Sequence, residues 1–223
     1  MKDKQTILIV GASDHAKVII DIFEKEGNKN IIGFIDSYKQ AGSINAGYPI
    51  LGKEENLPEI LDKNQGCKLF IAIGDNWVRK QMKDKLEKLI PDLDYISAIH
   101  PSVLIGKNVL IGNGVAIMAG AVINPYSEIS DFTIINTSSS LDHDCYIGKF
   151  SSIAPGVTLG GNVTVGDFTA ISIGATVTHG IKIGDHALIG AGALLLNNCP
   201  DNTVMYGLPA ETIKMRNAGD KYL

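Results

Sequence analysis

A six-residue repeat runs through the second half of this chain. From Ile99 to Leu195 every sixth residue is Ile, Leu or Val, seventeen times without a miss. Four places after each of these residues stands a second one that is small or β-branched. The two sets lie two positions apart, as in Val109 and Ile111, and side chains two apart in a strand share a face. Each unit therefore offers one inward pair, and such a fixed period predicts a solenoid.

The rest of each unit must turn a corner. The residue after the aliphatic position is Gly, Asn or Asp in ten of the seventeen units, Gly106 and Asn124 among them. These residue types tolerate left-handed backbone angles, so we expect the left-handed conformation at this position. Three faces give an 18-residue triangular coil, and 102 residues make five to six coils about 4.8 Å apart. Because aliphatic and small side chains fill the prism, function must lie on its outside or at its edges.

The first 98 residues alternate between strand-like and helical patterns. The expected elements are strands at 6–10, 31–35 and 69–73, a helix after residue 13 that buries Val18, Ile19, Ile22 and Phe23, and a helix over 77–89. Alternation of this kind indicates a small parallel α/β sheet, with ligands bound beyond the carboxyl ends of its strands. The sequence therefore predicts two domains, 1–97 and 98–223.

Polar residues stand at those strand ends. Ser13, Asp36 and Gly74 each follow a predicted strand. A dinucleotide motif is incomplete, because Ser13 and Ala16 replace its second and third glycines. The helix N-terminus nevertheless favours a phosphate group. The alternative is that Ser13 or Asp14 only caps the helix.

Composition excludes several classes of partner. The net charge is −4 and no run of Lys or Arg exceeds two residues, so we expect no nucleic-acid binding. The longest apolar stretch, 187–196, contains two glycines and is far shorter than the roughly 20 residues of a membrane span. The first ten residues lack the apolar length of a signal peptide. We expect a cytoplasmic protein. Cys145 and Cys199 occupy the small inward position, where a thiol acts as a small apolar residue.

One histidine stands out from the five in the chain. His143 is the third residue of its unit, on an outward corner, with Asp142 and Asp144 on either side. A carboxylate on one ring nitrogen fixes the tautomer and raises the basicity of the other. His143 is therefore the candidate general base.

A second histidine lies in the same column. His179 follows His143 by 36 residues, which is two coils, with Gly161 between them. At the spacing of stacked coils we expect the rings about 10 Å apart, too far to share a proton or a metal, and a notch at Gly161.

Several strings of residues resemble a known family. They are Gly11-Ala12-Ser13-Asp14-His15-Ala16, Phe34-Ile35-Asp36, Phe70-Ile71-Ala72-Ile73-Gly74, Asn136-Thr137-Ser138, Leu141-Asp142-His143-Asp144-Cys145 and Gly207-Leu208-Pro209-Ala210. Together they resemble the bacterial sugar acetyltransferases of the sialic acid O-acetyltransferase and bacillosamine N-acetyltransferase group, which belong to the hexapeptide-repeat acyltransferases. The resemblance implies a nucleotide-sugar-binding α/β domain, a left-handed parallel β-helix and a homotrimer. It also implies transfer of acetyl from acetyl-CoA to the amine of a nucleotide-linked 4-amino-4,6-dideoxy sugar, without a metal.

The resemblance also implies roles for individual residues. The expected catalytic residues are His143, Asp144 and Asn136; the expected sugar-nucleotide contacts are Ser13, Asp14, His15, Asp36, Ser37 and Gly74; and the expected coenzyme contacts are Ser152, Ile173 and Ala191. Ser152 stands where some relatives have a histidine. Since Asn136 lies one corner before Asp142, we expect it to meet the His143 of a neighbouring chain at a trimer seam.

Three alternatives remain open at this point. One is O-acetylation of a sialic-acid-like sugar. Another is zinc catalysis of the γ-carbonic-anhydrase type, although the spacing of His143, His179 and His186 does not match it. The third is a non-enzymatic trimer that only binds a sugar nucleotide. Acetyl-CoA binding separates the last alternative from the enzymes.

Overall fold

The computed structural model describes residues 4–221, which form two compact units. The first unit contains the described residues up to Gly74 together with Val78–Pro101. The second joins Asp75–Trp77 to the described residues from Ser102 onward. The boundary between 97 and 98 remains a prediction from the sequence. Asp75–Trp77 belong to the second unit, although the residues on either side of them in the sequence belong to the first.

The first unit is a mostly parallel sheet with helices, as the alternating pattern predicts. Its elements are β1 (Gln5–Val10), α1 (Asp14–Glu26), β2 (Lys29–Ile35), β3 (Ile44–Asn45), β4 (Tyr48–Gly52), the 3-10 turn η1 (Glu54–Asn56), α2 (Leu57–Lys63), β5 (Lys68–Ile71), α3 (Asn76–Leu89), whose first two residues belong to the second unit, and β6 (Ala98–Ile99). The strand order is β3-β4-β2-β1-β5. Only the β3–β4 pair is antiparallel. The carboxyl ends of β1, β2, β4 and β5 therefore lie at the same edge of the sheet, and α1 begins at that edge after β1.

The buried face of α1 differs from the prediction at one position. Ala16, Ile19, Ile20 and Phe23 are buried at the spacing of one helical stripe, with Ile22 beside them. Val18, which we expected to be buried, is 40% exposed because it falls outside that stripe. The helix ends at Gly27, whose φ of 73° is the left-handed cap that glycine adopts without strain.

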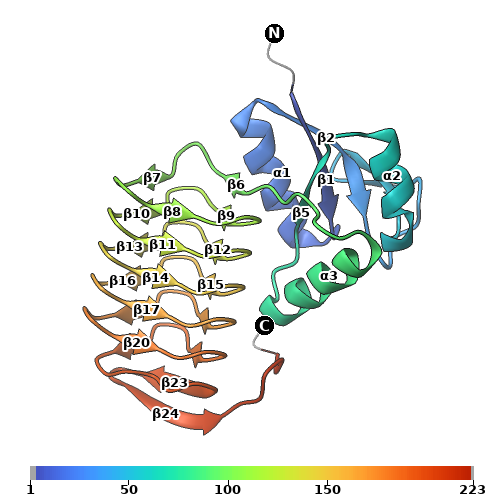
Figure 1. Cartoon of the computed structure of the whole chain (residues 1–223). Helices are drawn as coiled ribbons and strands as arrows, with labels where there is room; N and C mark the ends of the chain where they lie inside the picture. The colour runs from blue at the N-terminus through green and yellow to red at the C-terminus, as the bar shows by residue number, and fades with distance from the viewer. Residues whose placement is uncertain (1–3, 222–223) are drawn as a thin grey trace. The chain divides into compact units, whose positions relative to one another are not determined.

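The second unit is a three-sided parallel β-helix, as the repeat predicts (Figure 1). Its strands β7 to β22 have two residues each and recur every six residues, from Leu104–Ile105 to Leu194–Leu195. Each strand from β7 to β19 pairs with the one 18 residues later, as Val122 does with Ser140. After the last coil, β23 (Thr203–Gly207) pairs with β21 (Leu188–Ile189), and β24 (Ala210–Met215) returns antiparallel to β23.

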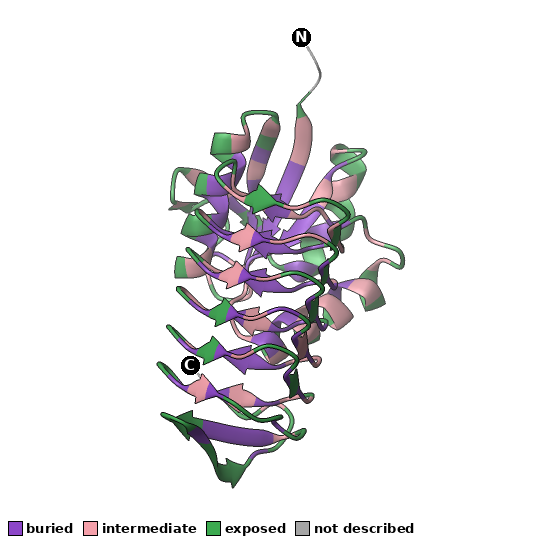
Figure 2. Cartoon of the chain, turned by 90° about the vertical axis from the view of Figure 1, so that its left-hand side faces the viewer, coloured by how far each residue is buried: buried purple, intermediate pink, exposed green. Residues whose placement is uncertain are grey.

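The inward pairs fill the prism. Buried and exposed stretches alternate along each coil (Figure 2). Ile123, Ile135 and Leu195 are completely buried, as are the small positions that carry hydroxyl groups. Four of them donate to a carbonyl oxygen 15 residues later, as Ser151 does to Gly166 at 2.7 Å and Thr133 to Gly148 at 3.0 Å. Ser139 instead donates to the Asn136 oxygen at 2.7 Å. The buried hydroxyls are therefore satisfied within the prism.

The corner prediction was wrong about which residue turns the chain. The left-handed conformation falls three residues after the aliphatic position, for example at Asn108 (φ 57°) and Phe150 (φ 56°). The glycines directly after the aliphatic position serve close packing between coils instead. A Cβ on Gly112 would lie 2.8 Å from the Asp131 nitrogen, so a larger residue would push the next coil away.

Candidate active site

His143 lies at a corner of the β-helix, two residues after the end of β13 (Ser140–Leu141). Its Nδ1 lies 2.7 Å from Oδ2 of Asp144, and its backbone nitrogen donates to Oδ1 of Asp142 at 2.8 Å. The His143 side chain is 49% exposed. With Nδ1 bonded to a carboxylate, Nε2 is the nitrogen left to exchange a proton.

The charges around His143 make it a stronger base. The hydrogen bond to the Asp144 carboxylate raises the pKa of His143 above its ordinary value of 6.5. Desolvation opposes this effect, and the charges of Asp142 and Asp144 raise the pKa further. The pKa of Asp142 is lowered by the His143 N–H and by the amide of Asn124, which donates to it at 3.0 Å. The sequence reasoning missed Asn124, although it stands 18 residues before Asp142 in the same column.

His179 lies closer to His143 than the sequence predicts. The two ring centroids are 6.4 Å apart, not about 10 Å. The prediction used the spacing of the backbones, whereas the His143 ring lies over the coil that separates the two histidines. A Cβ on Gly161 would lie 2.7 Å from Nε2 of His143. The His143 ring therefore occupies the space at Gly161 where we expected a notch.

Two edges of the prism carry the predicted residues of the second unit. The His143 edge contains the corners 142–144, 160–162 and 178–180, and the Asn136 edge contains the corners 136–138, 172–174 and 190–192. Asn136 follows β12 (Ile134–Ile135), and its Oδ1 accepts the Thr137 N–H at 2.8 Å. Ile173, 63% exposed, and Ala191 lie on the same edge. The structure groups these three residues and leaves β13 between them and His143, so one chain does not bring the two edges together.

Ser152 lies on neither edge. It stands in β15 (Ser152–Ile153), and its hydroxyl donates to Oδ1 of Asn76 at 2.6 Å. Asn76 is almost fully buried and donates to the Thr169 oxygen at 3.2 Å. The sequence reasoning missed Asn76, because nothing in the repeat indicates a partner 76 residues away.

The three histidines of the zinc alternative do not lie together. His186 lies on the third edge of the prism and stacks on Phe168, with ring centroids 4.7 Å apart. Burial lowers the pKa of His186. Across residues 4–221, no group of three or more His, Cys, Asp or Glu side chains is placed to hold a metal ion.

In the first unit, Asp36 organises the carboxyl edge of the sheet. Its Oδ2 accepts the Ala12 N–H at 2.8 Å, and its Oδ1 accepts the Tyr38 and Lys39 N–H groups at 2.9 and 3.0 Å. Burial raises the pKa of Asp36, but these three N–H groups and Lys39 outweigh it and the pKa is lowered. The carboxylate therefore joins the loop after β1 to the loop after β2.

His15 lies in the first turn of α1 and carries an unsatisfied atom. Its Nε2 is buried without a hydrogen-bond partner in the described part of the chain. Burial, helped by the charge of Arg79, lowers the pKa of His15 to about 4. Arg79 itself is buried and donates to the carbonyl oxygens of Ile73 and Gly74 at 2.9 and 2.8 Å. His15 is thus neutral at pH 7, and its free nitrogen is available to a ligand. The sequence reasoning missed Arg79.

The remaining predicted contacts of the first unit differ in how far they are engaged. Ser13 is the N-cap of α1, but its side chain makes no capping hydrogen bond. Asp14 is exposed and pairs with Lys17 at 2.7 Å. The Ser37 hydroxyl donates at 2.6 Å to Glu54, a buried carboxylate that also pairs with a lysine. Ser13 is therefore free for a ligand, whereas Ser37 is held by its own unit.

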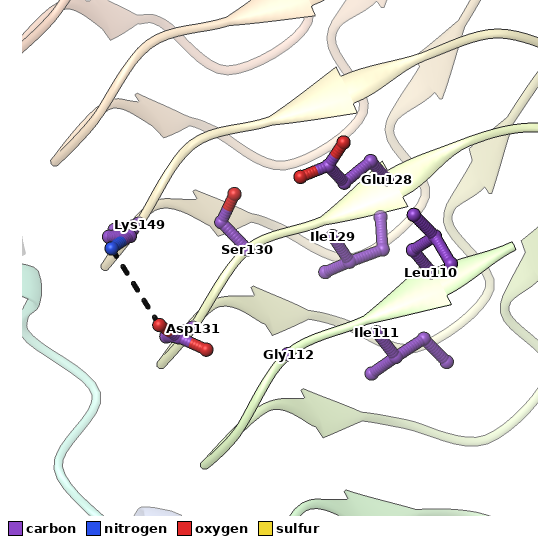
Figure 3. A pocket seen from close by; sticks show the side chains of 8 residues that line it. All are labelled: Leu110, Ile111, Gly112, Glu128, Ile129, Ser130, Asp131 and Lys149. Carbon is purple, nitrogen blue, oxygen red and sulfur yellow. Dashed lines mark ion pairs between the residues drawn. The ribbon is translucent and has the colours of Figure 1, made fainter.

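A pocket of about 270 Å³ lies elsewhere on the β-helix (Figure 3). It is lined by Leu110, Ile111, Gly112, Glu128, Ile129, Ser130, Asp131 and Lys149. Its polar end holds the Lys149–Asp131 ion pair at 3.8 Å. These residues lie toward the end of β11 (Glu128–Ile129) that is remote from the His143 edge, and no imidazole lines the pocket.

A helix crosses a membrane only if it is long and apolar enough. Within residues 4–221, none of the helices combines the length and apolar character needed to cross a bilayer.

The family comparisons match both halves of the chain. The PglD N-terminal domain matches residues 6–86, and the hexapeptide repeat of succinyl-transferase matches residues 142–166 and 172–196. Among curated proteins, UDP-N-acetylbacillosamine N-acetyltransferase of Bacillus subtilis (strain 168) is 30% identical over 121 residues. That alignment spans about half of each protein, 52% of this chain and 52% of the relative.

Solved structures match over nearly the whole chain. PerB from Caulobacter crescentus, solved with CoA and GDP-perosamine, is 35% identical, with 94% of this chain and 97% of PerB covered and a TM-score of 0.85. The acetyltransferase domain of PglB from Neisseria gonorrhoeae, solved with acetyl coenzyme A, is 29% identical, with 94% and 100% covered and a TM-score of 0.84.

Proposed function

This chain belongs to the family of nucleotide-sugar N-acetyltransferases that join a PglD-type N-terminal domain to a left-handed β-helix of hexapeptide repeats, and we propose that it acetylates a nucleotide-linked amino sugar from acetyl-CoA. The observation that carries the proposal is the 2.7 Å contact between His143 and Asp144 on an exposed corner. This pair supplies the general base that acyl transfer to an amine requires.

The chemistry follows from the geometry of that pair. The sugar amine attacks the thioester carbonyl, a C–N bond forms, the C–S bond breaks, and one N–H proton must be removed. Nε2 of His143 accepts that proton, because the Asp144 carboxylate holds the other ring nitrogen as N–H. The imidazolium then returns the proton to the departing thiolate, so that the thiol leaves neutral.

The sugar nucleotide belongs to the strand ends of the first unit. The N-terminus of α1 favours the diphosphate, and the uncapped Ser13 and the unsatisfied Nε2 of His15 offer polar contacts beside it. Asp36 contributes by holding the two loops that frame this edge. We propose a 4-amino-4,6-dideoxy sugar as the acceptor, because the chain resembles acetyltransferases of such sugars and matches PerB, which was solved with GDP-perosamine.

Acetyl-CoA belongs to the Asn136 edge. Ile173 and Ala191 are exposed there beside Gly174 and Gly192, which leave the backbone open to a pantetheine chain. Ser152 is a weaker coenzyme contact, since its hydroxyl is already bonded to Asn76. Because the two edges do not meet in one chain, we propose a homotrimer that sets the Asn136 edge of one chain beside the His143 edge of the next. We also propose a cytoplasmic location for this enzyme.

A substrate panel tests the function. UDP-, GDP- and CMP-linked amino sugars are incubated with acetyl-CoA, and release of the coenzyme thiol is followed. We expect rapid release with one 4-amino sugar and none with its 4-hydroxy counterpart. Release only with a hydroxyl acceptor would favour O-acetylation, and sugar-nucleotide binding without acetyl-CoA binding would leave a non-enzymatic trimer.

A mixing experiment tests the trimer. Trimers of His143→Ala and trimers of Asn136→Ala are unfolded together and refolded. If each site takes His143 and Asn136 from different chains, random mixing restores about a quarter of wild-type sites. A stable, active monomer in sedimentation, or no gain over the separate variants, would contradict the seam.

A further inference from the structure

The His143 ring, which lies over Gly161, has a second imidazole near it. The His143 ring lies there with its Cδ2–Nε2–Cε1 side against Gly161, and the His179 ring centroid is 6.4 Å from that of His143. The two rings therefore lie within one small region of the His143 edge. His179 has no role in the acyl transfer proposed for His143.

The overall reaction releases one proton that the transfer through His143 does not account for. A sugar amine is largely an ammonium ion at neutral pH, and only its neutral form attacks a thioester. Turnover converts R–NH₃⁺ and the thioester into an amide, a thiol and one released proton. His143 carries a single proton from the amine to the thiolate. The ammonium must first lose another proton, and that proton must reach solvent.

We propose that His179 accepts this first proton from the sugar ammonium and releases it to water. The inference rests on the proposed function. His179 is exposed, so it exchanges protons with solvent, and its ring centroid lies 6.4 Å from that of the proposed base. Once the proton has left, the neutral amine attacks and His143 takes the second one. Two histidines thus divide the two protons that the acceptor loses.

The charged groups around the pair agree with this division. Asp142 and Asp144 face His143, and the charges of His143 and His179 both help to lower the pKa of Asp142. The carboxylates favour an incoming cation, whereas two imidazolium ions 6.4 Å apart repel each other. The site therefore favours one added proton at a time.

The local backbone allows a clean test. The turn at 178–180 is held by bonds that do not involve the His179 ring, namely the Gly180 N–H to the Gly161 oxygen at 2.9 Å and the Thr178 hydroxyl to the Leu195 oxygen at 3.0 Å. Replacing the ring by Gln leaves these bonds in place. Lys107 offers a matched control, because it is an exposed side chain two coils before His143 in the same column, as His179 is two coils after.

The experiment measures kcat/KM for the amino sugar from pH 6 to 9.5 at saturating acetyl-CoA. For His179→Gln we expect a loss of about tenfold or more near pH 6.5 that shrinks to less than about twofold near pH 9.5, where the amine is already neutral. Free imidazole in the buffer should restore part of the loss at low pH. Lys107→Ala should follow the wild-type profile.

Two results would overturn the proposal. A loss of the same size at every pH would mean that His179 only shapes the site, and no loss at any pH would mean that water suffices as the first acceptor. A wild-type enzyme that acetylates none of the sugar nucleotides would instead contradict the proposed function.

Discussion

The strand ends of the first unit and the His143 edge of the second unit use titratable groups in opposite ways. At the strand ends, Asp36 and Arg79 are buried and bonded to backbone groups, and the Nε2 atom of His15 is buried without a partner. On the His143 edge, His143 and Asp144 are each about half exposed and bond to each other. One region uses polar groups to build its own loops, and the other displays them on a corner that the repeat has already built.

This difference in burial predicts different effects of substitution in the two regions. Removing one partner of a buried hydrogen bond costs about 1 to 3 kcal/mol of folding free energy, whereas exposed positions change it by about 0.5 kcal/mol or less. Changes at the strand ends should therefore affect substrate binding and stability together. Changes on the His143 edge should affect turnover alone.

The largest effect should come from His143→Ala. General-base catalysis supplies about 10² to 10⁴ in rate, so we expect kcat at pH 7 to fall by that factor, about 3 to 5 kcal/mol of barrier. The melting temperature and the trimer should be unchanged, because the side chain lies outside the packed prism. A drop in melting temperature of several degrees would break the comparison, since it would make the corner part of the fold.

The next effect is a pH dependence of stability at His15. Its pKa is about 4 in the folded protein against an ordinary value of 6.5, so the unfolded chain binds more protons between those values. The contribution is present above pH 6.5 and is lost as the pH falls toward 4, by about 3 kcal/mol at most. Urea unfolding at pH 7.5 and 4.5 should show a smaller loss for His15→Gln than for wild type. Equal losses would mean that His15 is solvated.

A smaller effect is expected at Asp36. In Asp36→Asn the amide keeps only one of the two acceptor oxygens, so the folding free energy should fall by about 1 to 3 kcal/mol. The KM for the sugar nucleotide should rise while that for acetyl-CoA stays nearly constant. The exposed Asp21, paired with Lys25 on α1, gives the control Asp21→Asn, which should leave all three quantities unchanged. Equal rises in both KM values would assign Asp36 to the fold alone.

The smallest effect should be that of Asp144→Asn. The imidazole stays but loses the charge that orients it and raises its pKa, so we expect kcat to fall by about tenfold. Asn suits the φ of 56° at this corner, and stability should not change. A loss as large as that of His143→Ala would show that the carboxylate does more than orient the base.

The sequence predicts the β-helix well because each of its contacts repeats. One hexad specifies a strand, an inward pair and a corner, and the three sheets follow from the 18-residue period. The prediction failed where side chains act between coils, at the glycines that allow close packing and at the approach of His179 to His143. The spacing of stacked backbones does not predict the direction in which long side chains extend.

The first unit was predicted less completely. The strands β1, β2 and β5 have long apolar runs and were expected, but β3, β4 and α2 are short and carry no clear period. The contact between His143 and Asp144 could be predicted because the two residues are neighbours in the sequence. Arg79 and Asn76 were missed because their partners are backbone atoms and a distant serine, which leave no pattern in the sequence.

The pH–rate profile of His143→Ala tests the central claim most directly. In the wild type, kcat should rise with pH through the raised pKa of His143 and then level off, since the base acts only when neutral. In the variant that limb should disappear, and the residual activity should keep climbing as the sugar amine loses its proton. A variant with wild-type kcat and an unchanged profile would contradict the account, because the base would then lie elsewhere or be unnecessary.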